Sequence, residues 1–211
     1  MVPAEREVAD SAEPETRQVA HWLLQSGVGS IDSGLLAYAS ARLLARPPAD
    51  DSPAREMTIA APATIPPYVS SSPYDPDFWN DPSVEPLNNC YNFATNFRSD
   101  TTAQPGRISG AHYSEFSCWN VGMAASYDGV GTTCAFVSNL VALVIWPGVD
   151  FHWYRLQAEG FWAHKVGHGP ATNLDSDGHV IQGERTPANC GRGPYALFCG
   201  YRYAPLETHV M

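Results

Sequence analysis

The sequence predicts an α+β fold in which N-terminal helices pack on an antiparallel β-sheet. Two segments with helical patterns, 90–97 and 115–127, come before a series of short segments rich in β-branched and aromatic residues. Helices followed by a run of strands indicate an α+β domain, because an α/β domain would alternate the two. With 211 residues, 44% of them hydrophobic, the chain is long enough to bury one core.

The first 73 residues differ in composition from the rest of the chain. Segments 15–25 and 33–46 have helical patterns, and a pair of prolines ends the second. Residues 47–73 are rich in proline, alanine and serine, a composition that favours an extended linker. We therefore predict a helical N-terminal extension over 1–46, a linker over 47–73 and a folded domain over 74–211.

Both helices of the domain have recognisable ends in the sequence. Asn88 and Asn89 can cap a helix from Cys90 to Phe97, because asparagine side chains accept hydrogen bonds from the free amides of a first helical turn. The second helical segment, 115–127, is followed by an Asp-Gly pair that closes it in a turn. Two short helices are therefore expected before the sheet.

The strands are expected in the second half of the domain. Segments 140–146, 151–156 and 160–165 are rich in β-branched and aromatic residues and are separated by Pro-Gly and Glu-Gly turns. A last aromatic segment, 195–203, has the composition of a closing strand. Because only short turns join the first three segments, we expect them to pair antiparallel.

The formal net charge of −10 excludes several classes of partner. A general nucleic-acid binder or an anionic-membrane binder needs a positive surface, which this composition does not supply. No apolar run approaches the roughly 18–20 residues of a membrane span, and the acidic start lacks the features of a signal peptide. We expect a soluble protein that binds neither nucleic acid nor membrane, and that is cytoplasmic or exported by a non-classical route.

The five cysteines form an odd set, so at least one is unpaired within the monomer. One arrangement pairs Cys190 with Cys199 across a tight loop. It also pairs Cys118 with Cys134, which leaves Cys90 alone. The alternative is five reduced cysteines, which the missing signal peptide favours.

Cys90 is the sharpest candidate for chemistry, because it opens a helix. Free amides and the positive end of the helix dipole favour thiolate over thiol, which lowers the pKa and makes the sulfur nucleophilic near neutral pH. The same amides can hold the oxyanion that forms when a thiolate attacks a carbonyl. Cys90 is therefore the predicted nucleophile, and packing as a small buried side chain is the alternative.

Two histidines could serve Cys90. His152 lies at the start of the second strand segment and His164 lies in the next strand, about equally far from the turn between them. They are therefore expected as cross-strand neighbours, and an even offset would place both on one face of the hairpin. A histidine base needs a partner that fixes its tautomer, and His164, or alternatively Asn173 or Asp175, can fill that role.

The segment from Asn89 to Ala94, Asn-Cys-Tyr-Asn-Phe-Ala, is followed by a strand histidine and then by a polar residue twelve positions later. This order resembles the papain-like NlpC/P60 group of cysteine peptidases and amidases over about 75 residues. The resemblance implies a papain-like fold with Cys90 as nucleophile, His152 as base and His164 as orienter. This sequence has Asn89 where the group commonly has aspartate, and two aromatic residues after His152 where glycines are usual.

The reaction implied by the resemblance is acyl transfer to water. Cys90 would attack the carbonyl of a peptide or amide, such as the stem peptide of peptidoglycan, and no cofactor is expected. The alternative function is a non-enzymatic binding or structural domain, which would keep the aromatic strands and be indifferent to Cys90.

A calcium-stabilised loop is a further version of that alternative. Four oxygen-bearing side chains and a glycine follow the spacing of an EF-hand loop: Asn173, Asp175, Asp177, Gly178 and Glu184. The preceding segment, 167–172, contains two glycines and a proline and cannot form the entering helix. We therefore expect an Asp-Gly turn between two short strands, 171–174 and 179–182, rather than a metal site.

Overall fold

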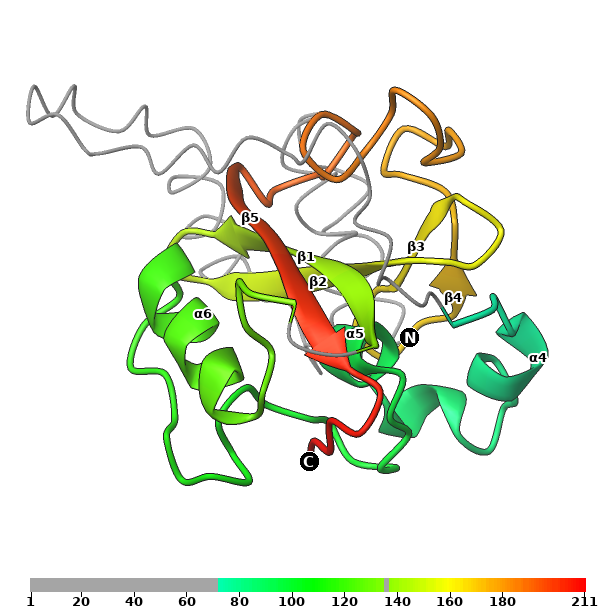
Figure 1. Cartoon of the computed structure of the whole chain (residues 1–211). Coiled ribbons are helices and arrows are strands. Elements are labelled where there is room, and N and C mark those ends of the chain that lie inside the picture. Colours follow the sequence, from blue (N-terminus) through cyan, green and yellow to red (C-terminus); the bar gives the residue numbers. More distant parts are fainter. Residues whose placement is uncertain (1–71, 135–136) are drawn as a thin grey trace, which may run out of the picture. The chain divides into compact units, whose positions relative to one another are not determined.

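The computed structural model describes residues 72–134 and 137–211. The predicted helices at 15–25 and 33–46, and the linker up to residue 71, lie outside the described residues. Figure 1 shows the elements in chain order: α4 (Pro76–Trp79), the 3-10 helix η1 (Glu85–Leu87), α5 (Cys90–Thr95), α6 (Cys118–Tyr127), β1 (Ser138–Trp146), β2 (Asp150–Leu156), β3 (Trp162–Lys165), β4 (Ala171–Thr172) and β5 (Leu197–Pro205). In this part of the chain, no helix has the length and apolar character needed to span a bilayer.

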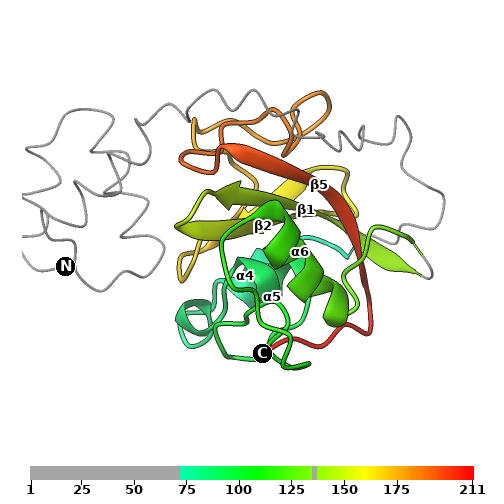
Figure 2. The same ribbon diagram turned by 90° about the vertical axis from the view of Figure 1, so that its left-hand side faces the viewer.

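The five strands form one antiparallel sheet in the order β4-β3-β2-β1-β5. Figure 2 shows α5 and α6 on one side of this sheet and the long connection from β4 to β5 on the other. We call these two sides the helix face and the loop face. Helices that precede an antiparallel sheet confirm the predicted α+β class.

The short helix α5 forms because its first turn is capped from both directions. The Asn89 side chain accepts hydrogen bonds from the amides of Tyr91 and Asn92, and the Asn92 side chain accepts one from the Asn89 amide. This reciprocal capping box satisfies amides that a helix end leaves free. At the other end Asn96 takes a left-handed conformation, with φ of 57°, and stops the helix.

Alternation along the strands assigns each side chain to one face of the sheet. In β1 and β2 the odd-numbered residues join the core under α5 and α6, as Leu143, Ile145 and Trp153 do. The even-numbered residues point to the loop face, where Val144 lies opposite His152. All nine residues of β1 are buried, so both faces of this strand are covered.

Two predicted strands are shorter than expected, and a third is not formed. The third strand begins at Trp162 rather than at residue 160, and β4 contains only Ala171 and Thr172. Segment 179–182 is not a strand, since isolated bridges alone tie it to its neighbours, such as Leu174 to Val180. The Asp-Gly turn between the two segments is present, because the Gly178 amide donates to the Asp175 carbonyl.

The disulfide of the described domain differs from each pairing considered above. Cys118, the first residue of α6, is bonded to Cys199 in β5, 81 residues away. Cys90 and Cys190 are buried thiols. Sheet order explains the bond, because β5 pairs with β1 and thereby comes to lie beside α6.

Candidate functional site

Cys90 lies inside the core and not at an accessible surface. Its side chain is 5% exposed and packs in the cluster that contains Tyr91 and Trp153. Burial, assisted by the nearby Asp150 carboxylate, raises the pKa of the thiol far above its usual value. The backbone amide of Cys90 favours the thiolate but does not offset this burial, and the Asn89 side chain occupies the amides of Tyr91 and Asn92. Cys90 is therefore held as a neutral thiol.

The two predicted histidines do meet, on the loop face. His152 and His164 are 1% and 2% exposed, and His152 Nε2 lies 2.8 Å from His164 Nδ1. The direct cross-strand partner of His164 is Tyr154, so the two imidazoles are diagonal neighbours on one face. The prediction that they share a face of the hairpin is confirmed.

A backbone carbonyl fixes the tautomers of this pair. His164 Nε2 lies 2.8 Å from the Leu174 carbonyl oxygen, which can only accept a hydrogen bond. His164 therefore carries its proton on Nε2 and accepts at Nδ1 from the Nε2–H group of His152. Burial lowers the pKa of His164 to about 4 and lowers that of His152 well below its usual value, so both rings stay neutral.

The sheet separates Cys90 from both histidines. Trp153 and Arg155 project to the helix face, where the Trp153 ring lies 5.4 Å from Tyr91 and the Arg155 guanidinium lies 4.4 Å from the Phe93 ring. His152 directly precedes Trp153 in β2 and therefore projects to the opposite face. The predicted nucleophile thus has neither histidine within reach as a base.

The alternative orienters do not contact the histidine pair either. The Asp175 carboxylate accepts four hydrogen bonds within its own loop, from the amides of Asp177, His179 and Gly191 and from the Arg185 guanidinium, at 2.8–3.0 Å. Asn173 accepts a hydrogen bond at its backbone carbonyl from the Ile181 amide. The sequence did not reveal the group that does orient His164, because a backbone carbonyl has no residue signature.

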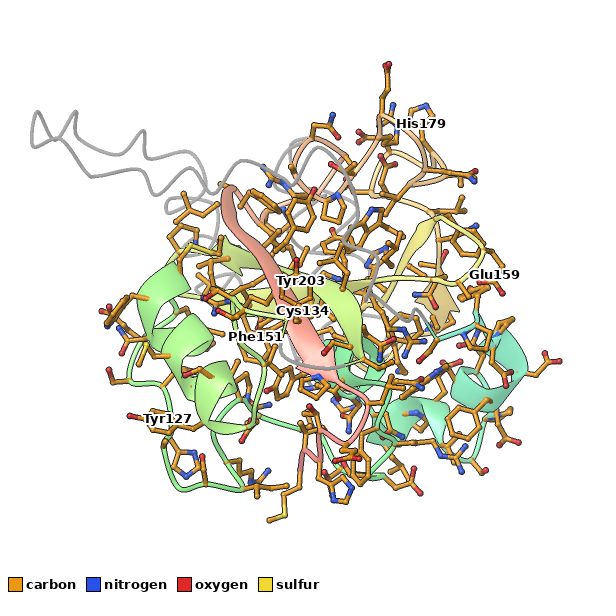
Figure 3. The ribbon with its side chains drawn as sticks, viewed as in Figure 1. Tyr127, Cys134, Phe151, Glu159, His179 and Tyr203 are labelled. Carbon is orange, nitrogen blue, oxygen red and sulfur yellow. A yellow bond between two sulfur atoms is a disulfide. The ribbon has the colours of Figure 1, made fainter. Side chains whose placement is uncertain are left out.

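The Asp175 carboxylate accepts hydrogen bonds from several parts of the loop between β4 and β5 and so holds them together. Burial of its side chain would raise the pKa, but the hydrogen bonds from His179, Gly191 and Arg185 outweigh that and lower it below its usual value. The carboxylate is therefore ionised and fully occupied by donors of the protein. This loop covers the histidine pair, and Figure 3 shows His179 at the outer edge of it.

The calcium spacing falls on this same loop, which is a hairpin and not a helix-loop-helix unit. The ligand atoms of Asp175, Asp177 and His179 lie within 4.8 Å of one another. Both oxygens of Asp175 already accept two hydrogen bonds each. Glu184, which would be the bidentate ligand of an EF-hand, is exposed beyond the turn. The geometry matches the expected Asp-Gly turn.

Two buried cations on the helix face were not anticipated from the sequence. Lys165 is fully buried, and its Nζ donates to the backbone carbonyls of Glu85, Gly167 and Gly169. Arg155 is also fully buried, and its Nη1 donates to the Asn96 side chain. Burial lowers the pKa of Lys165 to about 8 and that of Arg155 to about 9. Lys165 thus joins η1 to the segment that follows β3, and Arg155 joins β2 to the residue that ends α5.

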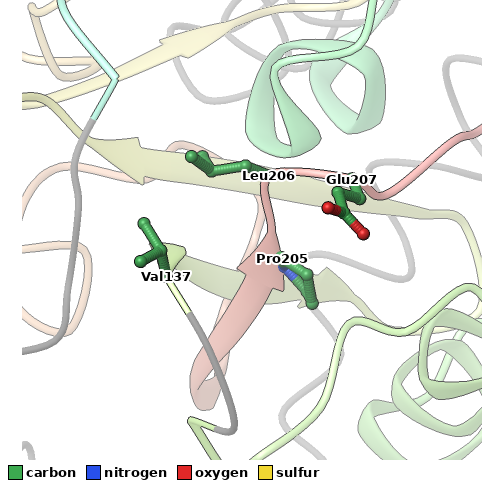
Figure 4. A pocket seen from close by; sticks show the side chains of 4 residues that line it. All are labelled: Val137, Pro205, Leu206 and Glu207. Carbon is green, nitrogen blue, oxygen red and sulfur yellow. The ribbon is translucent and has the colours of Figure 1, made fainter.

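A shallow hollow lies at the end of β5, away from the histidine pair. Figure 4 shows its described lining: Val137, Pro205, Leu206 and Glu207. These residues offer one charged group, the Glu207 carboxylate, and no second polar side chain beside it. A ligand site normally has several convergent polar groups, so this hollow is not a candidate for chemistry.

Fold and site together define a class of protein: a disulfide-linked α+β domain in which His152, His164 and Lys165 are buried and hydrogen-bonded to other groups of the protein. No family model and no solved structure matches the chain. The chain is 43% identical over 141 residues to insoluble matrix shell protein 1 of Ruditapes philippinarum, and the match spans 63% of this chain and 90% of that protein. The chain belongs to the family of insoluble matrix shell protein 1.

This relationship overturns the resemblance to NlpC/P60 enzymes. The relative is named an insoluble matrix shell protein and not a peptidase, so the predictions of a hydrolase, a thiol protease and an amidase are wrong. The physical reason lies in the faces of the sheet. The order and spacing of Cys90, His152 and His164 match that group, but the cysteine and the histidines project to opposite sides.

Proposed function

We propose that this chain is a non-enzymatic structural protein of an insoluble matrix. The observation that carries the proposal is the 43% identity to insoluble matrix shell protein 1 across 90% of that protein. It corresponds to the structural alternative that the sequence left open beside the hydrolase. With a net charge of −10, the absence of nucleic-acid and membrane partners stays a prediction.

The described groups support a structural role because they are arranged for stability. The Cys118–Cys199 disulfide closes a loop of 81 residues, which removes entropy worth roughly 4 kcal/mol from the unfolded chain. His152, His164 and Lys165 each bond to another part of the protein. Groups that are already satisfied by the protein have little capacity left to bind a reacting molecule.

Sequential extraction of the source tissue tests the proposal. An antibody against the full chain is used on fractions taken first with salt, then with EDTA, and finally with denaturant plus reductant. We expect the chain in the last fraction only. Recovery mainly in the salt extract, or in the cytosol of the cells, would contradict a role in an insoluble matrix.

A second measurement tests the absence of thiol hydrolysis. The full chain and its Cys90→Ala variant are compared on a panel of fluorogenic peptides and amides. We expect no turnover that depends on Cys90, because the thiol is buried and lacks a base. Hydrolysis by the natural chain that the variant loses would restore the enzymatic interpretation.

A further inference from the structure

The histidine pair lies beneath the loop that joins β4 to β5. His164 Nε2 donates to the carbonyl of Leu174, which is the second residue after β4. At the other end of the loop, two residues before β5, the ring of Tyr195 lies 5.2 Å from that of His152. The pair therefore contacts both ends of residues 173–196, which we call the covering loop.

Neither histidine can take up a proton in this arrangement without a penalty. His164 Nδ1 is the acceptor of the bond from His152 Nε2, so a proton there would place two donors 2.8 Å apart. The other available nitrogen, His152 Nδ1, belongs to a ring that is 1% exposed and packed against the rings of Tyr154 and Tyr195. The closed covering loop therefore disfavours the protonated form of both rings.

The charged groups around the pair do not compensate an added proton. Asp150, on β2, accepts from the Tyr195 hydroxyl, and Asp175, in the covering loop, is occupied by four donors. The Asp175 charge favours a protonated His164, but burial outweighs it. Arg192 adds a positive charge on the side of Tyr154, and the Cys190 thiol beside Tyr154 is neutral. Among the described residues, no carboxylate lies within ion-pair distance of either ring.

We propose that the histidine pair is a proton-sensitive latch, which holds the covering loop closed near neutral pH and releases it in acid. When the loop lifts, water reaches the two rings, and they bind protons with the ordinary affinity of histidine. Acid favours this open form because it binds protons that the closed form excludes. The latch is a property of the domain itself and does not rest on the proposed matrix role.

The range of pH follows from the direction of the two shifts. Burial lowers the pKa of His164 to about 4, and burial together with the neighbouring His164 lowers the pKa of His152 well below its usual value. The contribution of the pair to the closed form is therefore complete above the ordinary histidine pKa of about 6.5. It is lost progressively as the pH falls toward about 4.

Two buried thiols distinguish opening of the loop from unfolding of the domain. Cys190 lies in the covering loop, is 7% exposed and shares a hydrogen bond with Tyr154. Cys90 is 5% exposed and lies in the core on the helix face. A thiol reagent should therefore reach Cys190 when the loop lifts, whereas it reaches Cys90 only when the core unfolds.

Thiol labelling of the full chain measures the opening, with 4,4′-dithiodipyridine as a reagent that reacts in acid. Peptide mapping locates each modified cysteine, and its rate is divided by that of the same cysteine in the urea-unfolded chain at the same pH. We expect the relative rate of Cys190 to rise at least about tenfold from about pH 6 to about pH 4.5, because each proton taken up on opening contributes up to about tenfold per pH unit. Cys90 should stay protected throughout.

Two carboxylates of the loop face also titrate, and the design separates them from the histidines. Asp175 has a pKa below its usual value, so it stays ionised over this range of pH. Burial raises the pKa of Asp150 to about 6, which favours the closed form as the pH falls. Asp150 can therefore only weaken the response, and Asp150→Asn should not reduce it.

Two double variants test the assignment to the histidines. His152→Phe/His164→Phe keeps two rings, and His152→Gln/His164→Gln keeps two neutral hydrogen-bonding groups; neither binds the proton. In both, the relative rate of Cys190 should lose its rise in acid. The matched control His179→Gln removes an exposed imidazole from the same loop and should respond as the natural chain does. Circular dichroism confirms that each variant is folded.

Three results would overturn the latch. The first is a rise of less than tenfold at Cys190 in the natural chain. The second is labelling of Cys90 in step with Cys190, which would show unfolding of the whole domain. The third is a folded double variant that keeps the pH response of the natural chain, because another group would then be taking up the proton.

Discussion

The two faces of the sheet contain different ionisable residues and stabilise them in different ways. On the helix face, Lys165 and Arg155 donate to backbone and amide oxygens amid apolar packing, and a disulfide fixes α6 to β5. On the loop face, His152 and His164 bond to each other, and Asp175 collects four donors from its own loop. The helix face therefore combines hydrogen bonds with a covalent cross-link, whereas the groups described on the loop face are held by hydrogen bonds.

Removal of the disulfide should have the largest effect, and it acts on the helix face. We expect Cys118→Ser/Cys199→Ser to lower the free energy of unfolding by about 4 kcal/mol, because the unfolded chain regains the entropy of an 81-residue loop. Urea unfolding measures this. Reductant should destabilise the natural chain by a similar amount and leave the variant unchanged, and an equal response of both would show that the disulfide contributes nothing.

Loss of the Asp175 carboxylate should have the next largest effect, on the loop face. Asp175→Ala removes the acceptor of three backbone amides and one guanidinium, and we expect a loss of about 2–4 kcal/mol. Asp177→Ala, an exposed neighbour, is the control and should change stability by less than about 0.5 kcal/mol. Hydrogen exchange should locate the loosening in residues 173–193.

The pH dependence of Asp175 follows from the direction of its shift. Its pKa is lower in the folded state than in the unfolded chain, so its contribution is present above the unfolded value. That contribution is lost as the pH falls through the folded pKa. The Asp175→Ala variant should therefore lose less stability on acidification than the natural chain, and equal losses would contradict this assignment.

The sequence was sufficient to predict the fold class and most elements of the domain. Asparagine capping located α5, and clusters of β-branched and aromatic residues located β1, β2 and β5 to within a few residues. Equal distance from the turn placed His152 and His164 on one face. These features depend on neighbouring residues along the chain, which is why a single sequence can reveal them.

The side of the sheet that Cys90 faces could not be predicted. In β2 the residues of both faces are large and buried, His152 and Tyr154 on one and Phe151 and Trp153 on the other. Without an alternation of apolar and polar residues, no pattern shows which face meets α5. The disulfide could not be predicted for a related reason, because the order of strands in the sheet, and not local spacing along the chain, brings Cys118 to Cys199.

A smaller effect is expected when the histidine pair is broken. His164→Phe keeps a ring but leaves the buried Nε2–H group of His152 without its acceptor, and we expect a loss of about 2 kcal/mol in urea unfolding. The double variant His152→Phe/His164→Phe should recover part of that loss, because neither polar group remains. A double variant less stable than the single one would contradict the pairing of His152 with His164.

On the helix face, Tyr91→Phe removes one hydrogen bond to Asp128 and should lower the free energy of unfolding by about 1 kcal/mol.

The pH dependence expected from Asp150 has the opposite sign to that of Asp175. Burial raises the pKa of Asp150 to about 6, although the hydrogen bonds from Tyr195 and from the Phe151 amide oppose the rise. The folded state then holds the proton more tightly than the unfolded chain, whose aspartates titrate near pH 4. This contribution is therefore complete below about pH 4 and is lost as the pH rises to about 6. Asp150→Asn should flatten the stability profile between pH 4 and 6, whereas Asp175→Ala should flatten it at lower pH. If both variants altered the stability over the same range of pH, the pKa of Asp150 would not be raised by burial while that of Asp175 is lowered by hydrogen bonds.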